Sequence, residues 1–143
     1  MRLRANDERG SLSVFMVGFA FMGLGLAGML VDLSSMMNAY LRAADVAEQA
    51  ARAGADTIDA DYLRDTGQVR ISDEATACGR ADAIVAEHGD AGLVRLACGL
   101  PDDQHVTVTV RTTWDTYFLA AFGVSGGTRE ATATAGPLTG IGG

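Results

Sequence analysis

The chain has 143 residues with 11 basic residues, all arginine, and 18 acidic ones, so its formal net charge is −7 at pH 7. From Asp32 onward, 16 acidic residues stand against 8 arginines, and a surface of that sign repels phosphate backbones, which argues against nucleic acid as a partner. The roughly 110 residues that follow the N-terminal apolar run can bury one modest core, so we expect one domain.

An apolar run opens the chain. Ser11 to Val31 is free of charged residues and meets the length of about 20 residues that a helix needs to cross a bilayer. A cleavable secretory signal is the alternative, but its apolar region is only about 7–15 residues long and ends at a small-x-small site. Because this run continues into helix-forming sequence, we predict a retained transmembrane helix over residues 11–31.

Arginines flank the run unequally. Arg2, Arg4 and Arg9 lie in the basic leader, residues 1–10, whereas Arg42 is alone in the first ~15 residues after the run. This bias predicts a cytoplasmic N-terminus and an extracytoplasmic remainder, in contact with membrane lipid.

Small residues within the run offer surfaces for helix packing. On a helical projection they form two sides: Gly18, Gly25 and Gly28 in line with Asp32, and Gly23 with Ala27 opposite. Small residues let transmembrane helices approach closely, although glycine is common in such helices without a partner. Asp32, at the end of the run, is expected as an interfacial residue rather than a buried charge.

A stalk follows over residues 32–60, with helical periodicity and Gly54 as its weak point. One apolar face is predicted to carry Leu33, Met37, Tyr40, Ala44, Ala47, Ala51, Ala55 and Ile58. Beyond Ala44 we expect this face to pack on the chain's own domain. Nearer the membrane, we expect a partner helix to pack against this face.

The outer domain is predicted over residues 61–136, before a flexible tail at 137–143. We expect a strand from Thr66 to Ile71, and then a helix from Ala75 to His88, with Ser72 as its N-cap and Gly89 as its end. A strand from Leu93 to Cys98 and a turn over residues 99–103 should follow.

The clearest strand runs from His105 to Thr113, where valines alternate with polar residues. A short helix from Asp115 to Phe122 is expected to bring its aromatic side chains beside Trp114, capping one end of the core. A last strand, Thr128 to Ala135, completes the set. The predicted fold class is α+β, a long N-terminal helix packed on a small antiparallel sheet.

Cys78 and Cys98 are the two cysteines, and both fall on the predicted outer side. A disulfide closing a loop of about 20 residues would contribute roughly 3 kcal/mol in the chain-entropy model, and two free thiols are the alternative. His88 and His105 show no metal-ligand spacing with either cysteine, and they fall at element boundaries where solvated histidines are common. Since no catalytic motif appears either, we expect no enzyme, cofactor or metal.

Three stretches of the chain resemble a known family: ERGSLSVF at Glu8–Phe15, LAGMLVDLSS at Leu26–Ser35 and AEQAARAGAD at Ala47–Asp56. They are similar to the N-terminal region of actinobacterial TadE/TadG-like proteins of the tight-adherence (Flp) pilus system. The FLAAFGV stretch at Phe118–Val124 and the EATATA strand at Glu130–Ala135 resemble the end of such proteins.

The resemblance implies a pilin-like, membrane-anchored minor pilin or pilus-assembly component, acting in adhesion or secretion. Its implied partners are pilins, other TadE/TadG-like proteins and the membrane platform, with homo- or hetero-oligomers forming through the N-terminal helix. Prepilin-like members are processed after a glycine, here Gly10 before Ser11, and carry a glutamate five residues on, where this chain has Phe15. That departure points to the uncleaved, TadG-like branch.

Two other functions remain open at the level of sequence. One is a single-pass membrane protein with an extracytoplasmic binding or scaffold domain unrelated to pili. The other is a secreted enzyme, which would need converging polar groups near His88 or His105.

Overall fold

The computed structural model describes residues 8–138, with side chains from residue 12 onward. Most of the predicted leader and the end of the predicted tail lie outside the described residues. The described elements are, in chain order, α1 (Glu8–Ala55), α2 (Ala60–Thr66), α3 (Glu74–Glu87), β1 (Val94–Asp102), β2 (His105–Trp114), the 3-10 helix η1 (Leu119–Phe122) and β3 (Gly127–Ala135).

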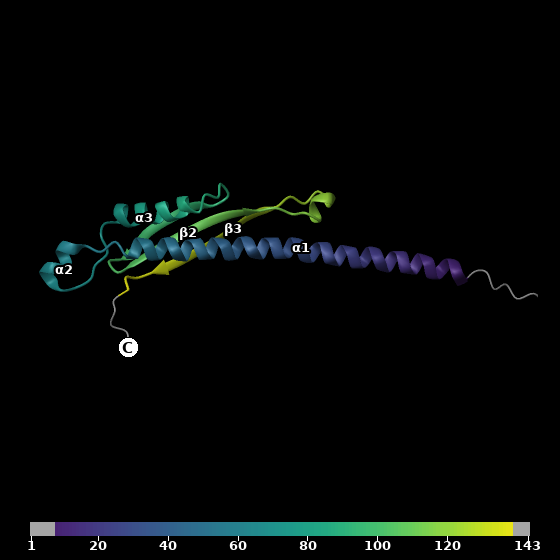
Figure 1. The fold of residues 1–143 in the computed structure, drawn as a ribbon, viewed down its shortest axis with the longest axis horizontal. Helices are drawn as coiled ribbons and strands as arrows, with labels where there is room; N and C mark the ends of the chain where they lie inside the picture. The colour runs from purple at the N-terminus through teal and green to yellow at the C-terminus, as the bar shows by residue number, and fades with distance from the viewer. Residues whose placement is uncertain (1–7, 139–143) are drawn as a thin grey trace, which may run out of the picture.

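Helix α1 is continuous over 48 residues, which corresponds to about 72 Å at 1.5 Å per residue. Its C-terminal part lies along the sheet, whereas its N-terminal part extends beyond the rest of the fold (Figure 1). The prediction of one helix joining the apolar run to the stalk is confirmed, with its end at Ala55 rather than Ile58.

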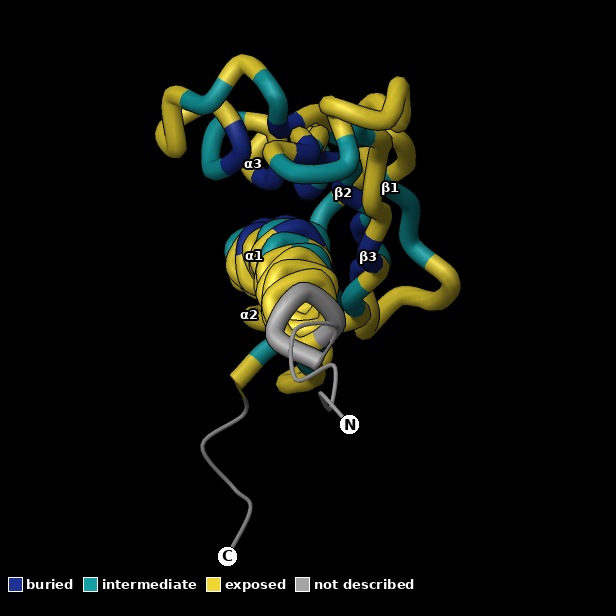
Figure 2. The backbone as a smooth tube through the Cα atoms, turned by 90° about the vertical axis from the view of Figure 1, so that its right-hand side faces the viewer, coloured by how far each residue is buried: buried dark blue, intermediate teal, exposed yellow. Residues whose placement is uncertain are grey.

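The three strands form an antiparallel sheet in the order β1-β2-β3. Helices α1 and α3 both lie on one face of this sheet, and the buried residues gather between them and the strands (Figure 2). The predicted α+β class, a long N-terminal helix on a small antiparallel sheet, is therefore confirmed.

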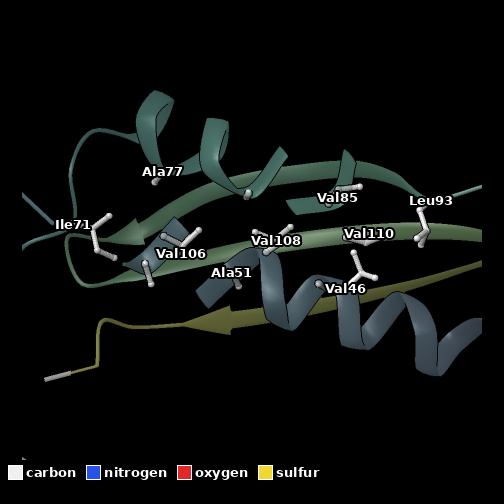
Figure 3. Close-up of a cluster of buried hydrophobic side chains, with 13 residues drawn as sticks. Val46, Ala51, Ile71, Ala77, Val85, Leu93, Val106, Val108 and Val110 are labelled. Atoms are coloured by element: carbon white, nitrogen blue, oxygen red, sulfur yellow. The ribbon is translucent and has the colours of Figure 1, made fainter. Parts of the chain in front are cut away.

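The core is made of small and β-branched side chains. Val106, Val108 and Val110 of β2 are fully buried and point toward α1 and α3 (Figure 3). The partners are Val46, Ala47, Ala50, Ala51 and Ala55 of α1, Ala77, Ala81 and Val85 of α3, and Ile71 and Leu93. Such small residues let the elements approach closely: a Cβ added at Gly54 would lie 3.0 Å from the Ala77 carbonyl oxygen.

The buried face of the stalk agrees with the prediction beyond Ala44, where Ala47, Ala51 and Ala55 are buried. Leu33 and Met37, where a partner helix is expected, are 49% and 57% exposed. The domain also covers the adjacent side of the helix, because small residues admit the strands where large ones would hold them away. The residues buried there are Ala39, Ala43, Val46 and Ala50.

The predicted strand at Thr66–Ile71 is wrong, and helix α2 was not predicted. Asp59 accepts a hydrogen bond from the Tyr62 N–H at 3.0 Å, which starts α2. This bond, followed by that from the Arg70 guanidinium, lowers the pKa of Asp59. After the helix the backbone forms only one isolated bridge among the described residues, Ile58 with Ile71.

Helix α3 lies close to its predicted bounds, but Asp73 rather than Ser72 is the N-cap. The Asp73 side chain accepts hydrogen bonds from the Thr76 hydroxyl and N–H, and these lower its pKa. The predicted turn at 99–103 is also corrected, since β1 continues through Pro101 to a two-residue turn at 103–104. Proline is tolerated there because β1 is an edge strand and its register shifts between Gly99 and Asp102.

Strands β2 and β3 fall where the alternation predicts them. Their outer face carries cross-strand pairs, Thr107 with Thr134 and Thr109 with Thr132, whose hydroxyls lie 2.8 and 2.9 Å apart. On the side facing the helices, a disulfide between Cys78 and Cys98 joins α3 to β1, with a Cα–Cα distance of 5.8 Å.

Candidate functional site on the N-terminal helix

The first part of α1 presents an apolar surface to solvent. From Leu12 to Val31, which we call the apolar segment, every large apolar side chain is between 49% and 74% exposed. Helix α1 is long and apolar enough to cross a membrane. At 1.5 Å per residue the apolar segment is about 30 Å long, which equals the thickness of a bilayer's hydrocarbon core. It is therefore a candidate membrane span.

Asp32 follows directly and is only 2% exposed. Its carboxylate accepts hydrogen bonds from the backbone N–H groups of Tyr117 and Leu119, both at 2.7 Å, and from that of Phe118 at 3.2 Å. We call this arrangement the Asp32 cap, because it satisfies the free amides at the start of η1. The expectation that this carboxylate is not buried is thus wrong, since backbone amides 85 to 87 residues further along the chain cover it. Its position at a membrane interface stays a prediction.

Gly28 lies one helical turn before Asp32 and faces the Phe118 ring. A Cβ at Gly28 would overlap that ring, so the absence of a side chain is what lets η1 approach α1. Gly18, Gly23 and Gly25 differ, since no described atom outside the helix backbone lies within 4 Å of a Cβ placed on them. Packing of a second helix against these three glycines and Ala27 stays a prediction.

The segment between β2 and β3, residues 115–126, forms what we call the aromatic turn. The Thr116 hydroxyl donates to the Val124 carbonyl at 2.6 Å, which closes the turn, and the Ser35 hydroxyl donates to the Asp115 carbonyl at 3.2 Å, which ties it to α1. Only residues 119–122 are helical, so the predicted helix from Asp115 is shortened. Because the residues before η1 wrap around the Asp32 carboxylate, they cannot continue that helix.

The aromatic side chains of this turn do not cap the core as expected. Tyr117 and Phe122 are 73% and 72% exposed, and the Phe118 ring lies tilted by 53° against that of Phe122, with ring centroids 5.5 Å apart. In Figure 1 the turn lies at the end of the sheet nearest the apolar half of α1, opposite α2. The core instead ends with Val110 and Leu93 (Figure 3).

A groove of about 660 Å³ opens between α1 and the end of β2, next to the aromatic turn. Leu30, Ser34 and Asn38 line it from α1, and Thr112, Trp114 and Tyr117 from the other wall. These side chains suit packing and hydrogen bonding. Arg42, which also lines the groove, pairs with Asp90 at 2.9 Å and so holds α1 to the loop after α3.

A second exposed apolar surface continues the apolar segment along α1. It consists of Leu33, Met37, Tyr40 and Leu41, which we call the open stripe; each is 45% exposed or more. The described part of the chain leaves about half of each side chain exposed, and they lie where the sequence predicts a partner helix. The open stripe therefore adds a candidate protein contact to the candidate membrane span.

The two histidines lie apart from this site. His105 pairs through Nδ1 with the Asp102 carboxylate at 2.8 Å, beside the β1–β2 turn, and His88 is the C-cap residue of α3. Hydrogen bonds from the Gln104 N–H and then from His105 lower the pKa of Asp102. Within residues 8–138, no group of three or more His, Cys, Asp or Glu side chains is placed to hold a metal ion.

Residues 10–57 match the family model described as "Putative Flp pilus-assembly TadE/G-like". This match confirms the resemblance to TadE/TadG-like proteins over about a third of the chain and supports involvement in pilus assembly. It covers the apolar segment, the Asp32 position and the stalk up to the end of α1. No curated protein and no solved structure matches the chain.

Proposed function

We propose that this protein is a membrane-anchored component of a tight-adherence pilus-assembly system that acts by helix packing and subunit contacts rather than by catalysis. The observation that carries the proposal is the division of one unbroken helix. Its first part exposes apolar side chains over the length of a bilayer, and its last part forms the domain core. The family match to residues 10–57 supports the link to pili.

We further propose that the N-terminus faces the cytoplasm and the domain lies outside. The excess of arginines before the apolar segment supports this orientation. The disulfide between Cys78 and Cys98 supports it independently, because disulfides persist mainly in oxidising compartments.

The open stripe is the proposed contact for a neighbouring subunit, such as a pilin or another TadE/TadG-like protein. It is apolar, continuous with the anchor and free of the domain's own strands. A helix from another subunit that leaves the membrane alongside α1 would meet it without any rearrangement. Within the bilayer, Gly18, Gly23, Gly25 and Ala27 offer the same helix a close approach.

Deletion of the gene and complementation with two variants test this proposal. We expect the deletion to reduce surface pili, and the Met37→Asp variant to restore far fewer pili than the wild type does. The Gln49→Glu variant, which adds the same charge at an exposed position of α1 about two turns beyond the open stripe, should restore them. All variants should resist alkaline extraction from membranes.

Two results would contradict the proposal in different ways. Unchanged number and length of pili in the deletion strain would favour a membrane scaffold unrelated to pili. A freely soluble native protein would remove the anchor itself. Intact mass of the extracted protein tests processing, and we expect residues 1–10 to be retained because Phe15 stands where processed members carry a glutamate.

A further inference from the structure

The aromatic turn carries large apolar side chains that neither the core nor α1 covers. Tyr117 and Phe122 are almost three-quarters exposed and Val124 is 46% exposed. Residues 116–126 contain no charged side chain, although the outer domain as a whole is acidic. Aromatic side chains gathered on an uncharged stretch of this length are unusual for a surface that faces only water.

The Asp32 cap fixes where this turn lies along α1. Its three hydrogen bonds hold residues 117–119 level with Asp32, the first residue after the apolar segment. The Phe118 ring packs on Gly28, four residues or about 6 Å nearer the centre of the apolar segment. If the apolar segment spans a bilayer, the turn lies at the boundary between headgroups and hydrocarbon.

That depth matches the chemistry of the exposed side chains. Tyrosine and tryptophan concentrate at membrane interfaces, where the ring contacts hydrocarbon and the polar atom stays hydrated. Tyr117 supplies such a ring, and Phe122 adds a purely apolar one. The buried carboxylate of Asp32 fits the same position, because three amides replace the water that a carboxylate loses on approaching lipid.

We propose that the aromatic turn is a second membrane contact, which inserts Tyr117 and Phe122 into the outer interface of the bilayer that α1 crosses. The domain is then held at two points, by α1 and by the turn, so that it cannot swing freely about the end of the helix. This inference rests on the membrane anchor of the proposed function and adds a fixed orientation of the domain relative to the bilayer.

Nitroxide labels on the full chain test the proposal in vesicles of phosphatidylethanolamine and phosphatidylglycerol. The labelled variants are Phe122→Cys and, as a second position in the turn, Tyr117→Cys. Labelling without reductant keeps the Cys78–Cys98 disulfide closed. Phe21→Cys in the apolar segment gives the reference accessibility for a label in lipid. Asp61→Cys in α2, whose side chain is 91% exposed at the far end of the domain, gives the reference accessibility for a label in water.

The measurement is the accessibility of each label to oxygen, which concentrates in lipid, relative to a water-soluble nickel chelate. We expect the labels at 122 and 117 to shift from the value at Asp61 toward that at Phe21. The additional change Asp32→Ala, which removes the carboxylate that accepts the three hydrogen bonds, should move the label at 122 back toward the value for water.

Three outcomes would overturn the inference. If the label at 122 matches that at Asp61 while that at Phe21 reports lipid, the turn does not touch the membrane although the anchor stands. If the label at Phe21 also reports water, the anchor of the proposed function fails. If the label at 122 is shielded from both reagents and broadened by a neighbouring label, a second copy of the chain covers the turn instead.

Discussion

Removal of the cross-link between α3 and β1, by Cys78→Ser together with Cys98→Ser, is expected to destabilise the α+β domain strongly. The two cysteines are 20 residues apart in sequence, and closing a loop of that length restricts the unfolded chain by about 3 kcal/mol in the chain-entropy model. Helix α3 buries only Ala77, Ala81 and Val85 in the core, so packing alone holds it weakly to the sheet once the disulfide is removed.

Urea unfolding of the detergent-solubilised chain measures this effect. Trp114, the one tryptophan of the sequence, lies at the far end of β2 from the disulfide and reports on the sheet by its fluorescence. Domains of this size are stable by about 5–15 kcal/mol, so a loss of about 3 kcal/mol moves the midpoint clearly. The slope of unfolding free energy against urea concentration should increase as well, because a chain without the cross-link exposes more surface when it unfolds.

Reductant provides the matched control. The wild-type protein in dithiothreitol should unfold at the same urea concentration as the double variant, and the double variant should not respond to dithiothreitol. A difference below about 1 kcal/mol between oxidised and reduced protein would refute the reasoning, since it is less than half of the loop-closure value.

Three further predictions concern the core, the contact between α1 and η1, and the capping carboxylates. Val108→Ala, at a fully buried position, should cost about 2 kcal/mol in urea unfolding, whereas Thr109→Ala on the outer face should cost less than about 1 kcal/mol; equal losses would contradict the assignment of faces. Gly28→Ala should displace the aromatic turn and speed its cleavage by chymotrypsin, whereas Gly25→Ala, with open space around it, should not; equal cleavage rates would argue against the close approach. Because the N-cap hydrogen bond and then a guanidinium hold the pKa of Asp59 below 3.8, its contribution to stability is present above that pH and is lost as pH falls below it. Asp59→Asn should therefore flatten the fall of unfolding free energy on acidification, and an unchanged pH dependence would argue against it.

The sequence alone determined the features that depend on local periodicity. The uncharged run from Ser11 to Val31 and the alanine-rich repeat after it predict one long helix, because each residue's place on a helix follows from its neighbours alone. The alternation from His105 to Thr113 likewise identifies β2, since the period of a strand is two. Both elements lie where these patterns put them.

Local signals were less informative where two readings compete. Val69 and Ile71 favour a strand, but the capping hydrogen bonds of Asp59 and the pairing of Asp59 with Arg70 favour helix α2 followed by irregular chain. The turn predicted over residues 99–103 is mostly part of β1, because an edge strand accommodates Pro101. The tolerance of this proline depends on which strand lies at the edge of the sheet.

The candidate site needed the tertiary structure. Sequence analysis placed Gly28 and Asp32 on one side of the helix, but it expected a second helix or water there. The true neighbours are Tyr117, Phe118 and Leu119, which are 85 to 87 residues away along the chain. A charge at the end of an apolar run signals that a partner is required, and it does not say which backbone amides will supply the hydrogen bonds.

What the sequence determines by itself is therefore the apolar segment, the continuity of α1 and the strand β2, because these follow from regular repeats of apolar residues. Only the tertiary structure decides which side of α1 is buried below Ala44, what covers Asp32, and that the aromatic turn lies beside the apolar segment. Those features arise from contacts between segments distant in sequence, where the fit of small residues and the need to satisfy buried polar groups select one arrangement among many.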